Sequence, residues 1–181
     1  ASGAYIVESS RFDDALTYAK LNNAHITAGY GNDSVTIIGD SNNSSIALGD
    51  NASGVSNSGT SDVNQAILMG AMVNSSLFGD AGADAITLKG ALSGSTVLTG
   101  DGADTVVVEN TITNSSLDTG DGDDSIRLEG SLLENSTILS GDGNDILLVF
   151  GHVDNGHLNA GSGDDLISLR SCGAVTRLRG G

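Results

Sequence analysis

Residues 120–139 read GDGDDSIRLEGSLLENSTIL, and this stretch defines a repeat that recurs along the chain. The repeat begins with Gly-x-Gly-x-Asp, continues with alternating apolar residues, and ends in an Asn-Ser corner followed by another aliphatic residue. The same opening recurs at 100–104, 141–145 and 161–165, with an isolated copy at 29–33 and a slipped copy at 79–84. A period of roughly 20 residues is typical of a solenoid, in which each period forms one turn.

The last residue of each copy, which we call the anchor, measures the period. Anchors lie at positions 14, 33, 64, 84, 104, 124, 145 and 165, and the copies at 14 and 64 lack the glycines. The anchors are almost evenly spaced, except for a longer interval between positions 33 and 64. Because surface loops accept insertions readily, we expect a surface insertion at 52–62. We predict one solenoid over 1–181, with its regular turns at 77–181.

Apolar residues alternate after each anchor, at its second and fourth following positions. The pairs are Val35/Ile37, Ile86/Leu88, Val106/Val108, Ile126/Leu128, Leu147/Val149 and Ile167/Leu169. This period of two predicts a strand with these side chains facing the core. A second aliphatic position follows later in each period, at Ile46, Leu77, Val97, Leu117, Ile138, Leu158 and Leu178. Two strands per turn predict an all-β, parallel β-solenoid of about eight turns, roughly 40 Å long.

The N-terminal stretch admits two interpretations. Residues 10–20 have the pattern of an amphipathic capping helix with Ser10 as its N-cap. They also fit the repeat, with Asp14 as anchor and with Leu16 and Tyr18 directed inward. We favour a degenerate first turn over residues 1–28.

Composition excludes several classes of function. The 181 residues contain 7 Lys and Arg against 23 Asp and Glu, a net charge of −16, which excludes an isolated nucleic-acid-binding surface. The chain has no run of roughly 20 apolar residues, so we predict no membrane insertion. A single cysteine excludes an intrachain disulfide framework. No arrangement of Ser, His and Asp or of paired acids stands out from the repeat, so we predict no enzymatic activity.

The glycine corners resemble the nonapeptide Gly-Gly-x-Gly-x-Asp-x-apolar-x of the repeats-in-toxin (RTX) family, whose β-helical loops bind calcium. Here Ser or Thr replaces the first glycine, and the resemblance covers 77–181 well and 1–76 loosely. It implies about four Ca²⁺ ions, one between each pair of adjacent corners. The implied ligands are the anchor carboxylates, with peptide carbonyls near the glycines: Asp84, Gly100, Gly102, Asp104, Gly120, Gly122, Asp124, Gly141, Gly143, Asp145, Gly161, Gly163 and Asp165. Gly29, Gly31 and Asp33 form a further candidate corner.

Elementary electrostatics supports the same prediction. Stacked turns place successive anchor carboxylates about 5 Å apart, where like charges repel and a cation between them attracts. Ligands that are all oxygen atoms suit Ca²⁺ better than Zn²⁺ or copper. An acidic surface without metal is the alternative interpretation. Asp101, Asp121 and Asp142 either face solvent or bind a second row of ions.

Only one corner of each turn carries the glycine motif, and this departs from many RTX arrays. One-sided decoration with turns of this length resembles the RTX modules of bacterial adhesins. The opposite corner carries Asn-Ser-Ser or a relative at 43–45, 74–76, 114–116 and 135–137. These corners create glycosylation sequons, but we favour a ladder of side-chain hydrogen bonds at a tight turn.

Outward positions of the later turns carry an unusual number of apolar residues. Val107, Ile146, Leu148, Phe150 and Leu166 would form an apolar patch, either a contact surface or a site where a neighbouring segment packs. We predict a secreted, calcium-stabilised structural solenoid of a bacterial surface protein, located outside the cell or on its surface. One alternative is a subunit of a filament or surface layer that associates through open solenoid ends or the patch. Another is the C-terminal export module of a secreted hydrolase.

Overall fold

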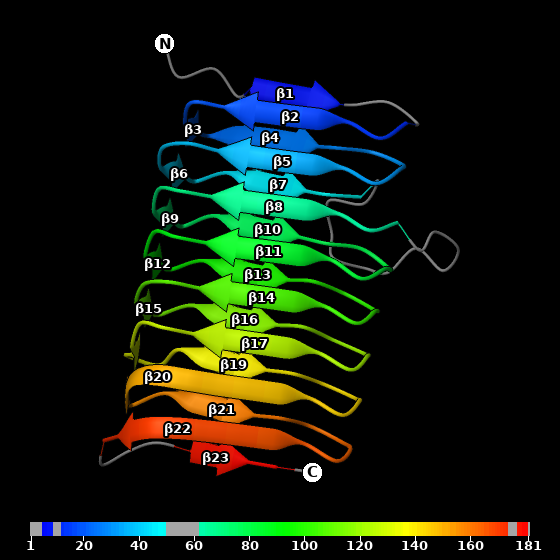
Figure 1. Cartoon of the computed structure of the whole chain (residues 1–181). Helices are drawn as coiled ribbons and strands as arrows, with labels where there is room; N and C mark the ends of the chain where they lie inside the picture. Colours follow the sequence, from blue (N-terminus) through cyan, green and yellow to red (C-terminus); the bar gives the residue numbers. More distant parts are fainter. Residues whose placement is uncertain (1–4, 9–11, 50–61, 174–176, 181) are drawn as a thin grey trace.

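The fold is a single stack of β-strand turns. The computed structural model describes residues 5–8, 12–49, 62–173 and 177–180, and all regular elements in these ranges are β-strands. The strands run parallel and stack along one axis from β1 to β23 (Figure 1). Eight of them, from β2 to β22, mark eight successive turns of the described chain. The prediction of an all-β, parallel β-solenoid of about eight turns is confirmed.

Three parallel ladders of strands form the walls of the solenoid. The long ladder contains β2 (Ala15–Tyr18), β5 (Ser34–Ile37), β8 (Gln65–Leu68), β11 (Ala85–Leu88), β14 (Thr105–Val108), β17 (Ser125–Leu128), β20 (Ile146–Asp154) and β22 (Leu166–Cys172). The short ladder contains β3 (Leu21–Asn22), β6 (Ser41–Asn42), β9 (Met72–Val73), β12 (Leu92–Ser93), β15 (Ile112–Thr113) and β18 (Leu132–Leu133). The third ladder contains β1 (Tyr5–Glu8), β4 (Ala24–Thr27), β7 (Ser45–Ala47), β10 (Ser76–Phe78), β13 (Thr96–Leu98), β16 (Ser116–Asp118), β19 (Thr137–Leu139), β21 (His157–Asn159) and β23 (Arg177–Arg179).

The expectation of two strands per turn was therefore incomplete. The two-residue strands of the short ladder lie where the sequence indicated only a corner, and they precede each Asn-Ser pair. A strand of two residues carries a single inward side chain, such as Leu92 or Ile112, and so leaves no alternation to detect. In β20 the long and short strands of one turn merge, because β20 pairs with both β17 and β18.

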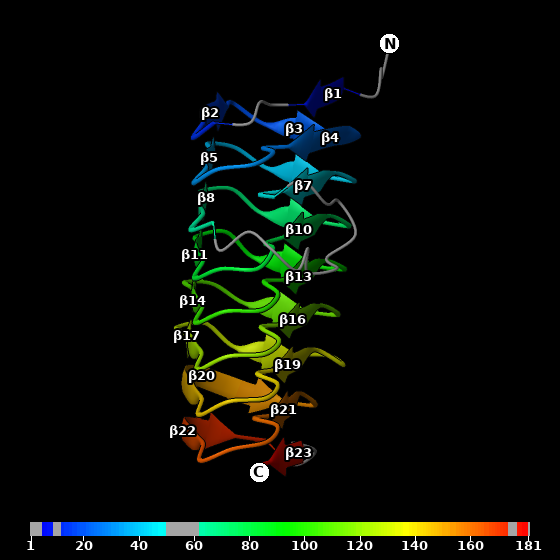
Figure 2. The ribbon, with the colours of Figure 1, turned by 90° about the vertical axis from the view of Figure 1, so that its right-hand side faces the viewer.

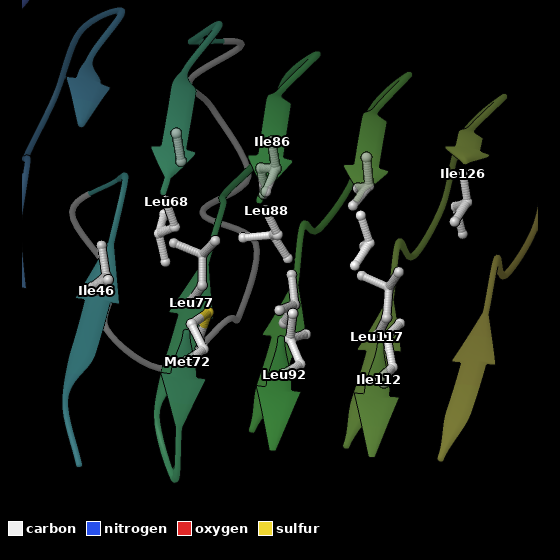
Figure 3. Packing of buried hydrophobic residues seen from close by; sticks show 14 of the residues in the cluster. Ile46, Leu68, Met72, Leu77, Ile86, Leu88, Leu92, Ile112, Leu117 and Ile126 are labelled. Carbon is white, nitrogen blue, oxygen red and sulfur yellow. The ribbon is translucent and has the colours of Figure 1, made fainter. Parts of the chain in front are cut away.

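A narrow aliphatic core fills the space between the ladders. Side chains of the long ladder such as Leu88 meet Leu92 from the short ladder and Leu77 from the third ladder (Figure 3). These three side chains are at most 1% exposed. The long and third ladders face each other across this core (Figure 2). Stacked aliphatic side chains of similar size fill such a space without aromatic rings, which explains why aromatic residues make up only 3% of the chain.

Strand pairing fixes the length of each turn. Ser34 pairs with Gln65, so the long interval between the anchors at 33 and 64 is a single turn. The additional residues lie after β7, which ends at Ala47, and before β8, which begins at Gln65. The corresponding connection of a regular turn is much shorter, from the end of β10 at Phe78 to the start of β11 at Ala85. Of the expected insertion at 52–62, only Asp62 lies within the described residues.

The first turn is built of strands rather than of a helix. Leu16 and Tyr18 in β2 pack against the core, and β2 pairs with β5 in register. The capping-helix interpretation was therefore wrong. β1 pairs with β4 one turn further on, so the strand pairing begins before the first anchor. The described residues contain no helix of the length and apolar character that crossing a bilayer requires.

The last strand departs from the expected pattern. Leu178 was expected in the core, yet it is 52% exposed, because β23 pairs with a described strand on one side only. Ile167 and Leu169 in β22 are partly buried for the same reason.

These two environments predict different costs for the same substitution. Leu117→Ala removes a fully buried side chain and should lower the free energy of unfolding by about 2–5 kcal/mol. Leu178→Ala, at an exposed position of the same ladder, should change it by about 0.5 kcal/mol or less. Urea unfolding followed by circular dichroism measures both values. Equal losses for the two variants would contradict this core.

Candidate metal-binding corners

The glycine corners stack along one edge of the solenoid, on the right-hand side of Figure 1, where the third ladder leads into the long ladder. The anchor side chains from Asp33 to Asp145 lie in the interior of this edge, and those of Asp14 and Asp165 at its two ends are partly buried. From Asp33 onward, the Oδ1 atom of each anchor accepts a hydrogen bond from the backbone N–H of the anchor one turn earlier. The N–H···Oδ1 contacts are Asp14–Asp33 2.8 Å, Asp33–Asn64 2.8 Å, Asn64–Asp84 2.9 Å, Asp84–Asp104 2.8 Å, Asp104–Asp124 2.7 Å, Asp124–Asp145 2.8 Å and Asp145–Asp165 3.0 Å.

The second carboxylate oxygen of most anchors has a different environment. In Asp33, Asp104, Asp124 and Asp145, Oδ2 is buried and has no hydrogen-bond partner among the described residues. Asp84 differs, because its Oδ2 accepts a bond from the Asp80 N–H at 3.3 Å. A buried carboxylate oxygen without a partner is costly, so each of these groups requires a proton or a cation.

Burial changes the proton affinity of these anchors. It raises the pKa of Asp84 and Asp124 from 3.8 to about 7, and that of Asp33 and Asp104 to about 6. Burial also raises the pKa of Asp145. Neighbouring carboxylates add to the effect, since Asp104 and Asp145 both repel the charge of Asp124. Backbone N–H donors to Oδ1 oppose it but do not outweigh the loss of water.

The glycines at these corners are required by how closely the turns approach. Gly122 has φ +142°, and a Cβ there would overlap the carbonyl oxygen of Gly102. Gly141 has φ +104°, and its Cβ would overlap the carbonyl oxygen of Gly120. Peptide oxygens of one corner therefore point at the glycines of the next corner. Both glycine columns have this structural role whether or not a cation is bound.

A column of hydroxyl side chains occupies the position of the first glycine in the RTX motif. Thr99, Thr119 and Ser140 are buried there. Thr99 Oγ1 donates to the carbonyl oxygen of Thr119 at 2.9 Å, and Thr119 Oγ1 donates to that of Ser140 at 3.1 Å. The same hydroxyls lie beside the Asp104 and Asp124 carboxyls and would lower their pKa only by turning their protons away from these carbonyl oxygens; burial outweighs this effect in both cases. The replacement of glycine by Thr or Ser thus adds a second hydrogen-bond ladder beside the anchors.

The remaining acidic residues of the motif lie outside this interior. Asp101, Asp121 and Asp142 are all exposed. Their backbones form bridges between successive turns, and the N–H of Gly102 donates to the carbonyl oxygen of Asp121 at 2.7 Å. Of the two interpretations left open by the sequence, this placement fits side chains that face solvent.

The donor set at each corner can be compared with the needs of a divalent cation. The described residues contain no group of three or more His, Cys, Asp or Glu side chains that could hold a metal ion. Each corner instead contributes one anchor carboxylate together with peptide oxygens, and the next carboxylate lies one turn further along the stack. Such a set, entirely of oxygen, fits Ca²⁺, which accepts carbonyl and carboxylate ligands in flexible geometry. The unpartnered Oδ2 atoms are the observation that favours this fit.

The further candidate corner at the N-terminal end has the same arrangement. Gly29 and Gly31 have φ of +102° and +111°, and Asp33 is 1% exposed. Asp165, at the opposite end, is only partly buried, beside the positive-φ residues Gly161 and Gly163.

One buried acid at this edge was not predicted from the sequence. Asp80 is 4% exposed, and its charge contributes to the raised pKa of Asp84. In the stack it occupies the column of Gly100, since Ala81 forms a bridge with Asp101. A Cβ at Gly49 would overlap the Asp80 carboxylate, so this side chain fills the space above a glycine. The signal was present in the slipped copy at 79–84, which carries Asp where the regular copies carry Gly.

The opposite corners form the ladder of side-chain hydrogen bonds that the sequence analysis favoured over glycosylation. Ser95 Oγ accepts from the N–H of Ser75 at 3.2 Å and donates to the carbonyl oxygen of Ser93 at 3.1 Å. Ser115 repeats both contacts one turn on, at 3.0 and 2.8 Å. The Asn before Ser75 adopts the left-handed conformation, with φ 48° at Asn74.

The predicted apolar patch lies on the outer face of the long ladder. Ile146 and Leu166 pair with each other and are 42% and 54% exposed. Leu148 and Phe150 are half-buried on the same ladder. Arg127 lies between Val107 and Leu148 in the stack, and its guanidinium lies 4.4 Å from the centroid of the Phe150 ring. The structure therefore groups four of the residues and separates Val107 from them.

The comparisons with known proteins add no relative. No family model matches the chain, and no curated protein or solved structure matches it either. The assignment of a function therefore depends on the geometry of the corners.

The raised pKa values predict how stability depends on pH without metal. Between the ordinary pKa of 3.8 and about 7, the folded protein binds more protons at Asp84 and Asp124 than the unfolded chain does. The free energy of unfolding should therefore fall as pH rises from 5 to 8, by about 1 kcal/mol or more. Urea unfolding of metal-stripped protein at the two pH values measures this change. Stability that stays constant or increases over this range would contradict charged, buried anchors.

Proposed function

We propose that this chain is a calcium-binding structural module of a secreted protein, acting outside the cell or on its surface. The observation that carries the proposal is the column of buried anchor carboxylates with unpartnered Oδ2 atoms among the described residues. The proposal assigns no catalysis to the chain. Its function is mechanical, namely to form a rod that holds its shape when calcium is present.

The anchors create a physical requirement that Ca²⁺ satisfies. Each turn with an Asp anchor adds one carboxylate to the same buried column, so the charge accumulates along the stack. In the absence of a cation, protonation removes the charge only below a pH of about 7, the raised pKa of Asp84 and Asp124, and above it the charge stays buried. A divalent cation would neutralise two such charges while leaving the Oδ1 hydrogen bonds between turns in place.

The residues that would hold the ions are those at the glycine corners. Asp84, Asp104, Asp124 and Asp145 would provide carboxylate oxygens, and the adjacent glycines would provide peptide oxygens. Bound Ca²⁺ would supply charge neutralisation and a link between neighbouring turns. With about four ions, the effect would be distributed along the rod rather than confined to one site.

Calcium dependence also explains why such a module belongs outside the cell. Extracellular modules bind Ca²⁺ with dissociation constants of about 10⁻⁴–10⁻³ M, so they fill only where calcium is abundant. Metal binding and folding are coupled when the unfolded chain lacks the site. A chain with a net charge of −16 would remain expanded during export and fold afterwards.

Replacing one anchor by its isosteric amide tests the proposal directly. Asp124→Asn keeps an Oδ1 acceptor for the Asp104 N–H, as Asn64 already does in its own turn, but removes the charge. Without calcium the variant should be at least as stable as the parent protein at pH 8, because a buried charge is gone. With calcium its gain in melting temperature should be smaller than that of the parent. Circular dichroism melts in millimolar calcium and in chelator measure both effects.

The matched control is Asp164→Asn, which makes the same chemical change one residue before an anchor, at an exposed position. It should retain the full calcium response. If the parent protein has the same melting curve with calcium, with magnesium and with chelator, the proposal is wrong. An Asp124→Asn variant that responds to calcium as fully as the parent would also contradict it.

The exposed outer face favours self-association as a second function. Ile146 and Leu166 lie side by side on the outer face and are 42% and 54% exposed. Burying such a pair against a second copy would remove apolar surface from water. Calcium-loaded protein should then form assemblies visible by negative-stain microscopy, and Ile146→Gln with Leu166→Gln should abolish them without altering the circular dichroism spectrum. A monodisperse monomer in calcium would exclude this function.

A further inference from the structure

A cavity of about 320 Å³ lies on the corner opposite the glycines, near the C-terminal end. It is lined by Asn135, Ser136, Thr137, Asn155, Gly156, His157 and Arg177. These residues come from three successive turns, since Thr137 pairs with His157 and His157 pairs with Arg177. The cavity lies on the third ladder and so is separate from the anchors.

The cavity lies where the repeat is broken. In earlier turns the inward serine of this corner is continuous, through Ser95, Ser115 and Ser136, but position 156 is a glycine. The outward residue that follows is His25 in the first turn, a small hydroxyl residue in the next five turns, and then His157 and Arg177. The five hydroxyl residues are Ser45, Ser76, Thr96, Ser116 and Thr137.

An extra residue widens the same corner. Glu134 and Asn135 both adopt the left-handed conformation, with φ of 49° and 58°, whereas the flanking turns use a single residue, Asn114 or Asn155. This addition explains why the anchors at 124 and 145 are one residue further apart than those at 104 and 124. Two departures from the repeat therefore meet in one place: an added residue, and the large side chains of His157 and Arg177 where the five preceding turns carry Ser or Thr. Gly156 itself leaves no room, because the Leu132 side chain fills the space that a Cβ would take.

The chemistry of the lining is that of an anion site. Arg177 is charged, none of the described lining residues is Asp or Glu, and the other polar side chains can all donate hydrogen bonds. The Asn155 side-chain amide donates a hydrogen bond to Asn135 Oδ1 at 3.4 Å. Because this contact holds the Asn135 oxygen toward Asn155, the side-chain N–H groups of Asn135 point away from Asn155. In a protein with a net charge of −16, a cavity whose described lining carries no carboxylate is a local exception.

One buried atom at the cavity is not satisfied by the fold. His157 Nδ1 is buried without a hydrogen-bond partner among the described residues. The His157 backbone is held in the ladder by its N–H bond to the Ser136 carbonyl oxygen at 2.9 Å, so the strand fixes where the side chain begins. Buried polar atoms are nearly always paired, and an exception marks a place where a ligand or water completes the structure.

We propose that this cavity binds a small oxyanion, either inorganic sulfate or the carboxylate of an acidic sugar. The Arg177 guanidinium would pair with two oxygen atoms of the anion, and Asn135, Thr137 and His157 would donate further hydrogen bonds. This site is independent of the calcium proposal, because none of its residues is an anchor. It would allow a calcium-stabilised rod to bind an acidic saccharide through one corner.

The test is an NMR titration of the full chain in calcium with sodium sulfate and, separately, with sodium glucuronate, at constant ionic strength. Saturable shifts of the amides of Asn135, Asn155 and His157 are expected with at least one anion. Tighter binding of glucuronate than of sulfate would identify the sugar as the source, and the reverse would identify the inorganic anion.

Arg177→Gln should weaken binding about tenfold, the effect of losing a charged hydrogen-bond donor. The matched control is Arg179→Gln, on the same strand and also exposed but outside the cavity lining, which should bind as the parent does. His157→Ser, which restores the residue type of the five preceding turns, should also weaken binding. The proposal is overturned if no amide shift saturates, or if the two arginine variants lose affinity equally.

Discussion

The structure depends on one repeated contact, the hydrogen bond from an anchor backbone N–H to the Oδ1 of the next anchor. It aligns every turn on the one before, as between Asp104 and Asp124 at 2.7 Å. An acceptor at this place is indispensable, but a charge is not, because Asn64 makes the same contact with an amide. The use of Asp at most anchors therefore adds a buried charge that the stacking itself does not need. A cation at the second oxygen, as proposed, would give that charge a function.

The two corners of each turn solve the same stacking problem in different ways. At one corner, serines such as Ser95 and Ser115 are neutral, and each donates and accepts within the ladder. At the other corner, most of the carboxylates leave one oxygen unsatisfied within the described chain. A solenoid closed entirely by neutral ladders would have no buried charge at its corners for pH or cations to act on. A solenoid with one edge of buried carboxylates couples its stability to pH and, on the proposed function, to the surrounding cations.

Much of the fold could be predicted from sequence because the repeat is regular. The inward residues, such as Ile86, Val106 and Ile126, recur at a fixed distance from an anchor and are all buried. The short ladder could not be predicted, because its strands have two residues and no alternation. Asp80 was missed because it occupies a column that holds glycine in the regular turns. The cavity beside Gly156 was missed because its lining comes from three different turns. The glycines were assigned to calcium by resemblance, whereas the close approach of successive corners already requires them.

A crystal structure of the protein grown in calcium tests the central claim most directly. The account predicts ions between adjacent glycine corners, bound by Oδ2 of Asp104, Asp124 and Asp145 at about 2.3–2.6 Å. It also predicts that the Oδ1 contacts between the anchors remain as they are without metal. Ordered corners without an ion, in which Oδ2 contacts only water or a protonated neighbour, would contradict the account. The anchors would then serve the stacking of the turns alone.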